Sequence, residues 1–341
     1  MGGDDVRDGV SLTNLDQPLF DGAGAVKRDL VDYLDAVAER IIPELRDRPL
    51  SVIRVLRGQA PFMQKNVPKY TPPWVQTVPL WAESSRREVS YALCNDRRTL
   101  LWFANQRAVE YHPTLMLAGR WDHPTYLVLD IDPPSPDPPS EPSSEPSSER
   151  SSDAPSDSPS HGTFGLAVRA AHLVRQALTE AGLAGAVKTS GAKGVHVFVP
   201  VSAEATAEEV AAATRAIAAR AERLDPDLAT TAFIREDRAG KVFLDSTRAG
   251  GATVAAVYSP RLRPGVPVSF PVPWDELDQV APADFTVHTA ARLVADADPW
   301  AGQMPAPQVL SSDLIEEGRA IPVARVQAMH EGKRRARARR G

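Results

Sequence analysis

The chain has 341 residues, of which 43% are hydrophobic and 24% charged, a balance typical of water-soluble globular proteins. The sequence holds no run of about 18 apolar residues, which excludes a transmembrane helix. Its N-terminus is acidic and lacks the apolar core of a secretory signal. The single cysteine, Cys94, excludes an intrachain disulfide and a cysteine-built metal site, so we expect a protein of the reducing cytoplasm.

The net charge of -5 is concentrated in one segment. Residues 133–162 carry six acidic side chains against Arg150, and 1 - 6 = -5 accounts for the whole excess. Twenty of these 30 residues are Pro or Ser, a composition that buries too little surface to offset the entropy of ordering, so we expect a disordered insert. The C-terminal HEGKRRARARRG is basic, and is either a solvated end or a segment that holds phosphates.

Helical and strand patterns alternate along the chain without clean βαβ repeats. They predict an α+β fold with a mixed or antiparallel central sheet flanked by helices. In chain order we expect a helix over Lys27–Leu45 and a strand over Ser51–Gly58. Residues 91–113 should form a strand, a turn at Asn95-Asp96 and then a helix, followed by a strand over Tyr126–Asp132 and a helix over Phe164–Ala181. We then expect a turn and strand over Lys188–Val201, a helix over Ala207–Leu224, strands over Gly240–Ser246 and Ala252–Pro260, and a poorly ordered tail with a short helix from Asp298.

Paired carboxylates end the strand YLVLDID. Because side chains alternate along a strand, Asp130 and Asp132 share one face, about 7 Å apart. Two carboxylates at that spacing repel unless a cation lies between them, and hard divalent cations prefer oxygen ligands. Read alone, the pair is either a metal site or a strand end running into an Asp-Pro turn.

A third acid favours the metal site. Asp245 follows the apolar strand of KVFLDS, again at a strand end. Two acids from one strand and one from another is the arrangement of two-metal phosphoryl-transfer sites, in which one metal activates a hydroxyl and the other holds the triphosphate. By itself Asp245 is equally a surface strand cap.

The stretch TSGAKGVHVFVP indicates phosphate binding. Gly191 and Gly194 permit a tight turn with exposed amides, and Ser190 and Lys193 suit phosphate oxygens. His196 follows on the strand, where a lone histidine is more often a structural residue. The stretch does not match a Walker A loop.

Taken together, DID, SGAKGVH, KVFLD and YSPRLRPGVPVSFPVPWDEL resemble the polymerase domain of bacterial ligase D, which belongs to the archaeo-eukaryotic primase superfamily and serves non-homologous end joining. LTNLDQPLF at Leu12 and FMQKN at Phe62 also match, so the resemblance spans roughly Leu12 to Trp300. We expect a primase-polymerase domain over 1–300, with the insert at 133–162, and a C-terminal extension with a basic tail over 301–341. No ligase or phosphoesterase sequence follows, which resembles the stand-alone form.

The resemblance implies a role for each group of site residues. Asp130, Asp132 and Asp245 would be catalytic and hold two Mn²⁺ or Mg²⁺ ions. The implied nucleotide contacts are Ser190, Lys193, His112 and Arg261, with His196 supporting them, and the implied DNA contacts are Phe62, Lys65, Lys27 and Arg54. The residues themselves give no independent reason for His112, which reads as a histidine at a helix end.

Several positions depart from the family pattern. Gln17 stands where the family usually has a lysine that, with one near Lys27, grips a 5′-phosphate across a gap. Ile53 replaces a lysine beside Arg54, and Met63 replaces a second aromatic residue that would stack on the template. Ser246 stands where the family often has tryptophan, and the family has only a short loop at the position of the insert.

We therefore expect a DNA-dependent polymerase that adds nucleotides, ribonucleotides included, to a primer 3′-hydroxyl during gap filling and end extension in double-strand break repair. Its expected partners are gapped or broken duplex DNA, nucleoside triphosphates, a Ku-type end-binding protein and a separate DNA ligase, with no membrane. Its expected place is the cytoplasm, at the nucleoid. Two alternatives remain: a D-x-D metal-dependent glycosyltransferase and a non-catalytic DNA-end-bridging module.

Overall fold

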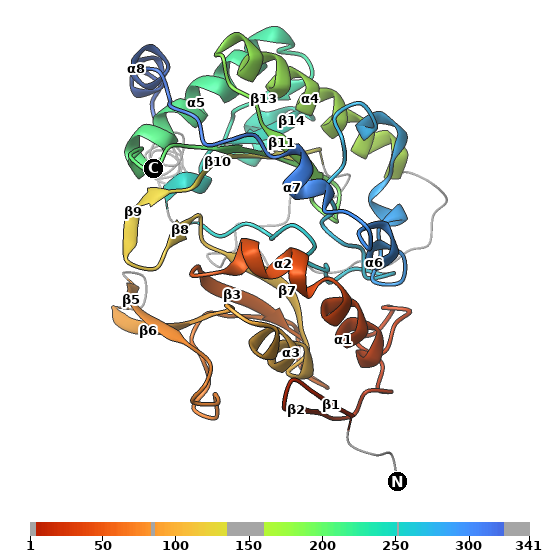
Figure 1. Cartoon of the computed structure of the whole chain (residues 1–341). Coiled ribbons are helices and arrows are strands. Elements are labelled where there is room, and N and C mark those ends of the chain that lie inside the picture. Colours follow the sequence, from red (N-terminus) through yellow and green to blue (C-terminus); the bar gives the residue numbers. More distant parts are fainter. Residues whose placement is uncertain (1–4, 83–85, 135–159, 251, 324–341) are drawn as a thin grey trace, which may run out of the picture. The chain divides into compact units, whose positions relative to one another are not determined.

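The computed structural model describes residues 5–82, 86–134, 160–250 and 252–323. By their internal contacts they form two compact units (Figure 1). The first unit contains the described residues of 1–125, 186–192 and 251–304, and the second those of 126–185, 193–250 and 305–341. Most residues of both units come from the expected primase-polymerase domain, but the second unit also includes the described residues 305–323. The boundary at residue 300 stays a prediction.

The first unit is built on an antiparallel sheet with the strand order β4-β3-β6-β5, and β7 also pairs with β3. Its elements are β1 (Asp5–Arg7), β2 (Val10–Leu12), α1 (Lys27–Ala36), α2 (Ala38–Leu45), β3 (Pro49–Arg54), β4 (Phe62–Gln64), β5 (Thr77–Ala82), β6 (Arg87–Leu93), α3 (Arg97–Asn105), β7 (Ala108–Pro113), β8 (Met116–Leu117), β9 (Arg120–Pro124), β11 (Ala186–Thr189), α6 (Ala290–Leu293) and α7 (Pro299–Gln303). Helix α3 packs against α1 and β7 (Figure 1), and the Phe103 ring meets that of Tyr111 edge to face.

The second unit is built on strands in the order β12-β10-β14-β13. Its elements are β10 (Tyr126–Asp132), α4 (Ser160–Glu180), β12 (Val195–Pro200), α5 (Ala207–Leu224), β13 (Ala229–Thr230), β14 (Val242–Asp245) and α8 (Ser312–Ala320). Helices α4 and α5 pack on this sheet and on each other, and α8 packs on α5 (Figure 1). Strand β10 pairs antiparallel with both β12 and β14, while β13 and β14 run parallel, so the mixed α+β architecture is confirmed.

Among the predicted elements, one helix and one strand of the first unit differ from the structure. The expected helix over Lys27–Leu45 is two helices separated at the buried Val37. No strand forms over the described part of 252–260. Val254 and Ala256 donate to carbonyls of β7, but the N–H of Tyr111 donates to the Ser259 hydroxyl instead of returning a backbone hydrogen bond to this segment.

The expected insert lies mostly outside the described residues. The tail expected to be poorly ordered from Asp298 is described as far as residue 323, and there it forms two helices, α7 and α8, instead of one short helix. Positions 160–162 of the segment expected to be disordered already belong to α4, and the basic residues 333–340 are not described.

Candidate active site

Two acidic side chains face each other across neighbouring strands. In the antiparallel pairing of β10 with β14, Asp130 lies directly opposite Asp245. Residues opposite one another on antiparallel strands point to the same face, and both carboxylates are almost fully buried, with 8% and 6% of their surface exposed. Asp132 follows two residues on, on the same face by the alternation of the strand, and it is exposed.

Each oxygen of the Asp130–Asp245 pair has a partner within the second unit. Asp130 Oδ1 lies 3.2 Å from His196 Nε2, and Asp130 Oδ2 accepts a 2.6 Å hydrogen bond from Arg248 Nη2. The same Arg248 nitrogen lies 3.0 Å from Asp245 Oδ2. Asp245 Oδ1 accepts from the backbone N–H and the hydroxyl of Thr247, at 2.8 and 2.6 Å. The sequence analysis expects His196 to support the nucleotide contacts, and this stays a prediction; in the structure His196 lies against Asp130.

The acids repel one another, as their spacing predicts. The negative charge of Asp130 raises the pKa of Asp132 to about 8, with Asp245 adding to the effect and Arg248 opposing it. Because the Asp132 side chain is exposed, we assign this shift to its acidic neighbours rather than to burial. A cation beside Asp132 would relieve the repulsion.

The chemistry of these donors fits a divalent cation, because hard cations prefer carboxylate oxygens. In the described part of the chain, however, no three His, Cys, Asp or Glu side chains lie together as a metal site requires. The guanidinium of Arg248 stands between two of the three acids. The structure thus brings Asp130 and Asp245 together without forming a finished metal site.

The loop from Ser190 to Gly194 depends on both glycines for different reasons. Gly191 has φ +70°, and an added Cβ would come within 2.7 Å of the Arg261 side chain. At Gly194 an added Cβ would come within 2.4 Å of the Ile131 carbonyl oxygen, so this glycine is needed for the close approach of the loop to β10. Ser190 Oγ accepts from the N–H of Ala192, which closes the turn, and the Lys193 side chain is exposed.

A buried cluster in the first unit collects two of the predicted nucleotide contacts around Glu110. The carboxylate of Glu110 lies 2.7 Å from His112 Nε2 and forms an ion pair with Arg261 Nε at 3.1 Å, and it accepts a 2.8 Å hydrogen bond from Leu262 N. Arg261 Nη1 donates to the carbonyl oxygen of Ser190. The prediction that His112 ends a helix is wrong, because α3 ends at Asn105 and His112 lies in β7.

Burial lowers the pKa of His112, against the opposing influence of Glu110. Burial alone would raise the pKa of Glu110, but Arg261 and His112 lower it to about 2. Both pKa shifts are consistent with a neutral His112 that donates a hydrogen bond from Nε2 to an ionised Glu110. The cluster thus holds one buried negative charge against the guanidinium of Arg261.

The predicted DNA contacts in β4 are exposed. Phe62 and Met63 show 36% and 45% of their surface on this edge strand, and Lys65 is exposed beside them. Arg54 is buried under them, with hydrogen bonds to Gln64, Tyr70 and Gln106. Arg54 therefore supports the strand, and the exposed Phe62 ring is the part that can stack on a base, since Met63 has no aromatic ring.

Lys27 is also buried, and its Nζ donates to the Thr13 carbonyl and to Asn105 Oδ1, both at 2.6 Å. Burial, with a smaller contribution from the charge of Arg107, lowers the pKa of Lys27 to about 8. Arg107 also lies 3.3 Å from Gln17 Oε1. A second cation thus stands beside the position where the family's lysine is replaced by glutamine.

A comparison with protein families matches residues of both units. The family model of the LigD primase-polymerase domain matches residues 26–142 and 157–300. The chain belongs to the LigD primase-polymerase domain family. This is a family of nucleotidyltransferases, so the glycosyltransferase and non-catalytic alternatives are set aside.

Relatives and a solved structure agree with membership of the LigD family. The chain is 32% identical over 286 residues to the bifunctional non-homologous end joining protein LigD of Bacillus subtilis, and 29% identical over 273 residues to the multifunctional LigD of Mycolicibacterium smegmatis. These matches cover 82% and 79% of this chain but only 41% and 32% of the relatives. The polymerase domain of Mycobacterium tuberculosis ligase D, solved in complex with DNA, matches with a TM-score of 0.70 and 26% identity over 86% of this chain and 97% of that chain.

Sequence reasoning did not single out three charged residues that lie beside the predicted ones: Glu110 and Arg107 in the first unit, and Arg248 in the second. Each is a charged side chain whose partners are distant in sequence or on another element. For Glu110 a signal existed, since it lies two residues before His112 in a strand-like run and so shares its face. Arg248 follows Asp245 by three residues, but the irregular segment between them gave no basis for placing it.

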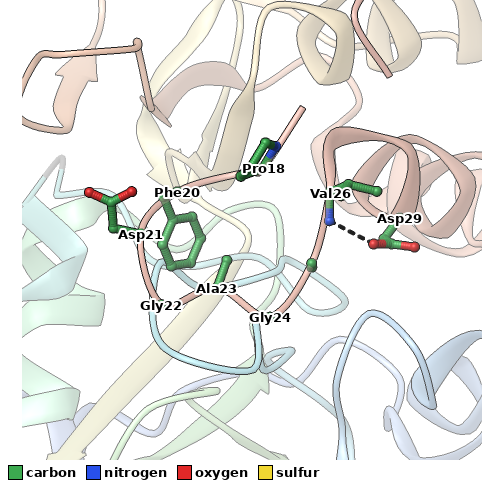
Figure 2. Close-up of a pocket in the computed structure, with 9 residues that line it drawn as sticks. Pro18, Phe20, Asp21, Gly22, Ala23, Gly24, Val26 and Asp29 are labelled. Atoms are coloured by element: carbon green, nitrogen blue, oxygen red, sulfur yellow. Dashed lines mark hydrogen bonds between the residues drawn. The ribbon is translucent and has the colours of Figure 1, made fainter. Parts of the chain in front are cut away.

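A pocket of about 370 Å³ lies in the first unit, where its lining residues Val26 and Asp29 flank the predicted DNA contact Lys27 in the sequence (Figure 2). The loop from Pro18 to Val26 lines it, and Asp29 accepts a 2.7 Å hydrogen bond from Val26 N at the start of α1. None of the predicted site residues is in its lining, so we assign it no part in the LigD-type reaction. None of the helices in the described ranges is long and apolar enough to cross a membrane.

Proposed function

We propose that this chain is a DNA-dependent polymerase that transfers nucleotides to a primer 3′-hydroxyl, filling gaps and extending ends during non-homologous end joining. The proposal rests on family membership and on one observation: Asp130 and Asp245 lie directly opposite each other, with Asp132 two residues further along β10. Bound Mn²⁺ or Mg²⁺ would lower the pKa of the primer hydroxyl and neutralise the triphosphate.

Within this proposal the chain's own residues bind and orient. Asp130, Asp132 and Asp245 supply the carboxylates for two ions, and His196 fixes the orientation of Asp130 through its 3.2 Å contact. The exposed Lys193 and the Ser190 hydroxyl offer donors to phosphate oxygens, and Arg261 is held for the same task by Glu110. Phe62 and Lys65 offer a stacking and phosphate-binding edge to DNA.

Partners follow from the same resemblance. The substrates are gapped or broken duplex DNA and nucleoside triphosphates, and a Ku-type end-binding protein and a DNA ligase would act on the same breaks. The names of the LigD relatives place them in end joining, and the solved polymerase domain was bound to DNA, which supports this assignment.

The decisive test is primer extension on a gapped duplex with Mn²⁺, comparing wild type with Asp132→Ala. We expect the variant to lose at least about a hundredfold in rate, because an exposed metal ligand is removed from a folded strand. Asp122→Ala is the matched control, since Asp122 is an exposed acid in β9 and belongs to no predicted site. Equal extension by all three proteins, or extension by none, would refute the proposal.

A further inference from the structure

Arg248 lies against two of the carboxylates to which the proposed function assigns metal binding. Its Nη2 lies 2.6 Å from Asp130 Oδ2 and 3.0 Å from Asp245 Oδ2, so one nitrogen bridges two carboxylates. Arg248 begins a short 3-10 helix (Arg248–Gly250) three residues after Asp245. A guanidinium stays charged at any pH that a protein tolerates, so it gives the acid pair a permanent positive partner.

The bridge uses the oxygen atoms that a metal would need. The other oxygens of the pair are held by His196, at Asp130 Oδ1, and by Thr247, at Asp245 Oδ1. Within the described residues, therefore, each of the four carboxylate oxygens has a protein partner.

Arg248 is held less completely than the acids that it bridges. Its Nε is buried without a hydrogen-bond partner among the described residues. A buried donor without a hydrogen-bond partner costs free energy, which disfavours this position of the arginine side chain. Moreover, the Arg248 side chain is 27% exposed, so it has a path to solvent that a fully enclosed arginine would lack.

We propose that Arg248 is a resident counter-ion of the acid pair, which a divalent cation displaces from Asp130 Oδ2 and Asp245 Oδ2 when it binds. Arg248 thereby sets the affinity of the site for metal and keeps the acids together while no metal is bound. The inference rests on the proposed function only in taking these acids as the metal ligands.

The test is direct Mn²⁺ binding to the full chain without DNA or nucleotide, measured by the electron paramagnetic resonance signal of unbound Mn²⁺. Arg248→Met should bind Mn²⁺ at least about tenfold more tightly than wild type, because a competing positive charge a few ångströms away is removed. Arg248→Lys keeps the charge without the planar fork and should fall between the two. Arg223→Met is the control, since Arg223 is an exposed arginine of α5 paired with Glu317.

Thermal unfolding adds a second readout. Without metal, Arg248→Met should unfold at a lower temperature than wild type, and Mn²⁺ should raise its Tm by more than it raises that of wild type. If the variant does not fold without metal, Mn²⁺ should restore its fold, and failure to do so would overturn the inference.

The outcomes separate the two proposals. Unchanged or weaker Mn²⁺ binding by Arg248→Met, with wild type binding normally, would overturn the role of Arg248 alone. No Mn²⁺ binding by wild type, or binding unaffected by Asp132→Ala, would instead contradict the metal site of the proposed function.

Discussion

Glu110 shows how one buried carboxylate can organise two residues that the sequence treats as unrelated. It contacts His112, two residues away in β7, and Arg261, 151 residues further along the chain. A buried carboxylate is costly unless it is paired and hydrogen-bonded, and here both conditions are met. The same contacts that stabilise Glu110 fix the side chains proposed to meet the nucleotide, so stability and function draw on one cluster.

The pKa of Lys27 leads to a prediction about 5′-phosphate recognition. Two of its three N–H donors are used by Thr13 and Asn105, which leaves the third for a phosphate. Its pKa of about 8 means that the ammonium group is charged at pH 7 and mostly neutral at pH 9. The affinity gained from a 5′-phosphate in a gapped duplex should therefore fall as pH rises through 8, by up to about tenfold per pH unit.

Fluorescence anisotropy with 5′-phosphorylated and 5′-hydroxyl gaps measures this gain as a ratio at each pH. The ratio cancels every pH effect that does not involve the phosphate, and the phosphate itself is a dianion throughout this range. Lys27→Arg should give a ratio that does not change with pH, because arginine stays charged. A wild-type ratio that is constant from pH 7 to 9.5 would show that Lys27 does not bind the phosphate.

At the scale of elements, strong periodic patterns in the sequence predicted helices and strands correctly, and weak patterns did not. The strand Tyr126–Asp132 and the helix Ala207–Leu224 have the predicted bounds, because each buries a clear apolar stripe. Strand β7 was not predicted, although two apolar residues alternate there with Glu110 and His112, because this short run reads as the end of the helix expected before it. The expected strand over 252–260 is not formed, because this segment makes only scattered backbone hydrogen bonds to β7.

The candidate site, too, was predicted in part from the sequence. Alternation along β10 predicted that Asp130 and Asp132 share a face, and apolar strands ending in acids predicted that Asp245 would lie nearby. The register of β10 against β14 cannot be read from either strand alone, since it is set by pairing between segments more than a hundred residues apart. The counter-ion Arg248 depends on that register and was therefore beyond prediction.

Helix α8 gives a prediction at the scale of an element. Its Gly318 packs so tightly on α5 that an added Cβ would lie 1.8 Å from the Ala212 carbonyl oxygen, and Arg215 donates to the Gly318 carbonyl. Gly318→Ala should therefore lower the free energy of unfolding by about 2 kcal/mol, the cost of overpacking outweighing the better helix propensity of alanine. Urea denaturation measures the change.

Gly302 provides the matched control for this substitution. It lies in helix α7, where an added Cβ would meet nothing within 4 Å, so Gly302→Ala should be neutral or slightly stabilising. Limited proteolysis shows whether α8 detaches from α5 in the Gly318 variant. Identical unfolding curves for the two alanine variants would mean that α8 does not depend on this close approach.

At the scale of the whole molecule, charge is distributed very unevenly. Residues 135–159 carry the same six acids and one arginine that make up the net charge of -5, so their removal would leave a chain of net charge -5 - (-5) = 0. Part of this stretch, residues 143–156, also lies outside the family match. The LigD-type fold therefore does not require residues 143–156, and we expect the effect of the whole stretch on DNA binding to be electrostatic.

Deletion of residues 135–159 should strengthen DNA binding a few-fold at low salt, because the six acidic side chains repel the DNA phosphates. The difference should vanish at high salt, because the screening length there is about 10 Å or shorter. Stability should change by less than about 1 kcal/mol, since loop-closure entropy grows only logarithmically with length. A matched variant with the six acids replaced by Asn and Gln separates charge from length. Unchanged affinity and salt slope in both variants would show that the insert adds length without acting on DNA, whereas a change in the deletion alone would point to loop length rather than charge.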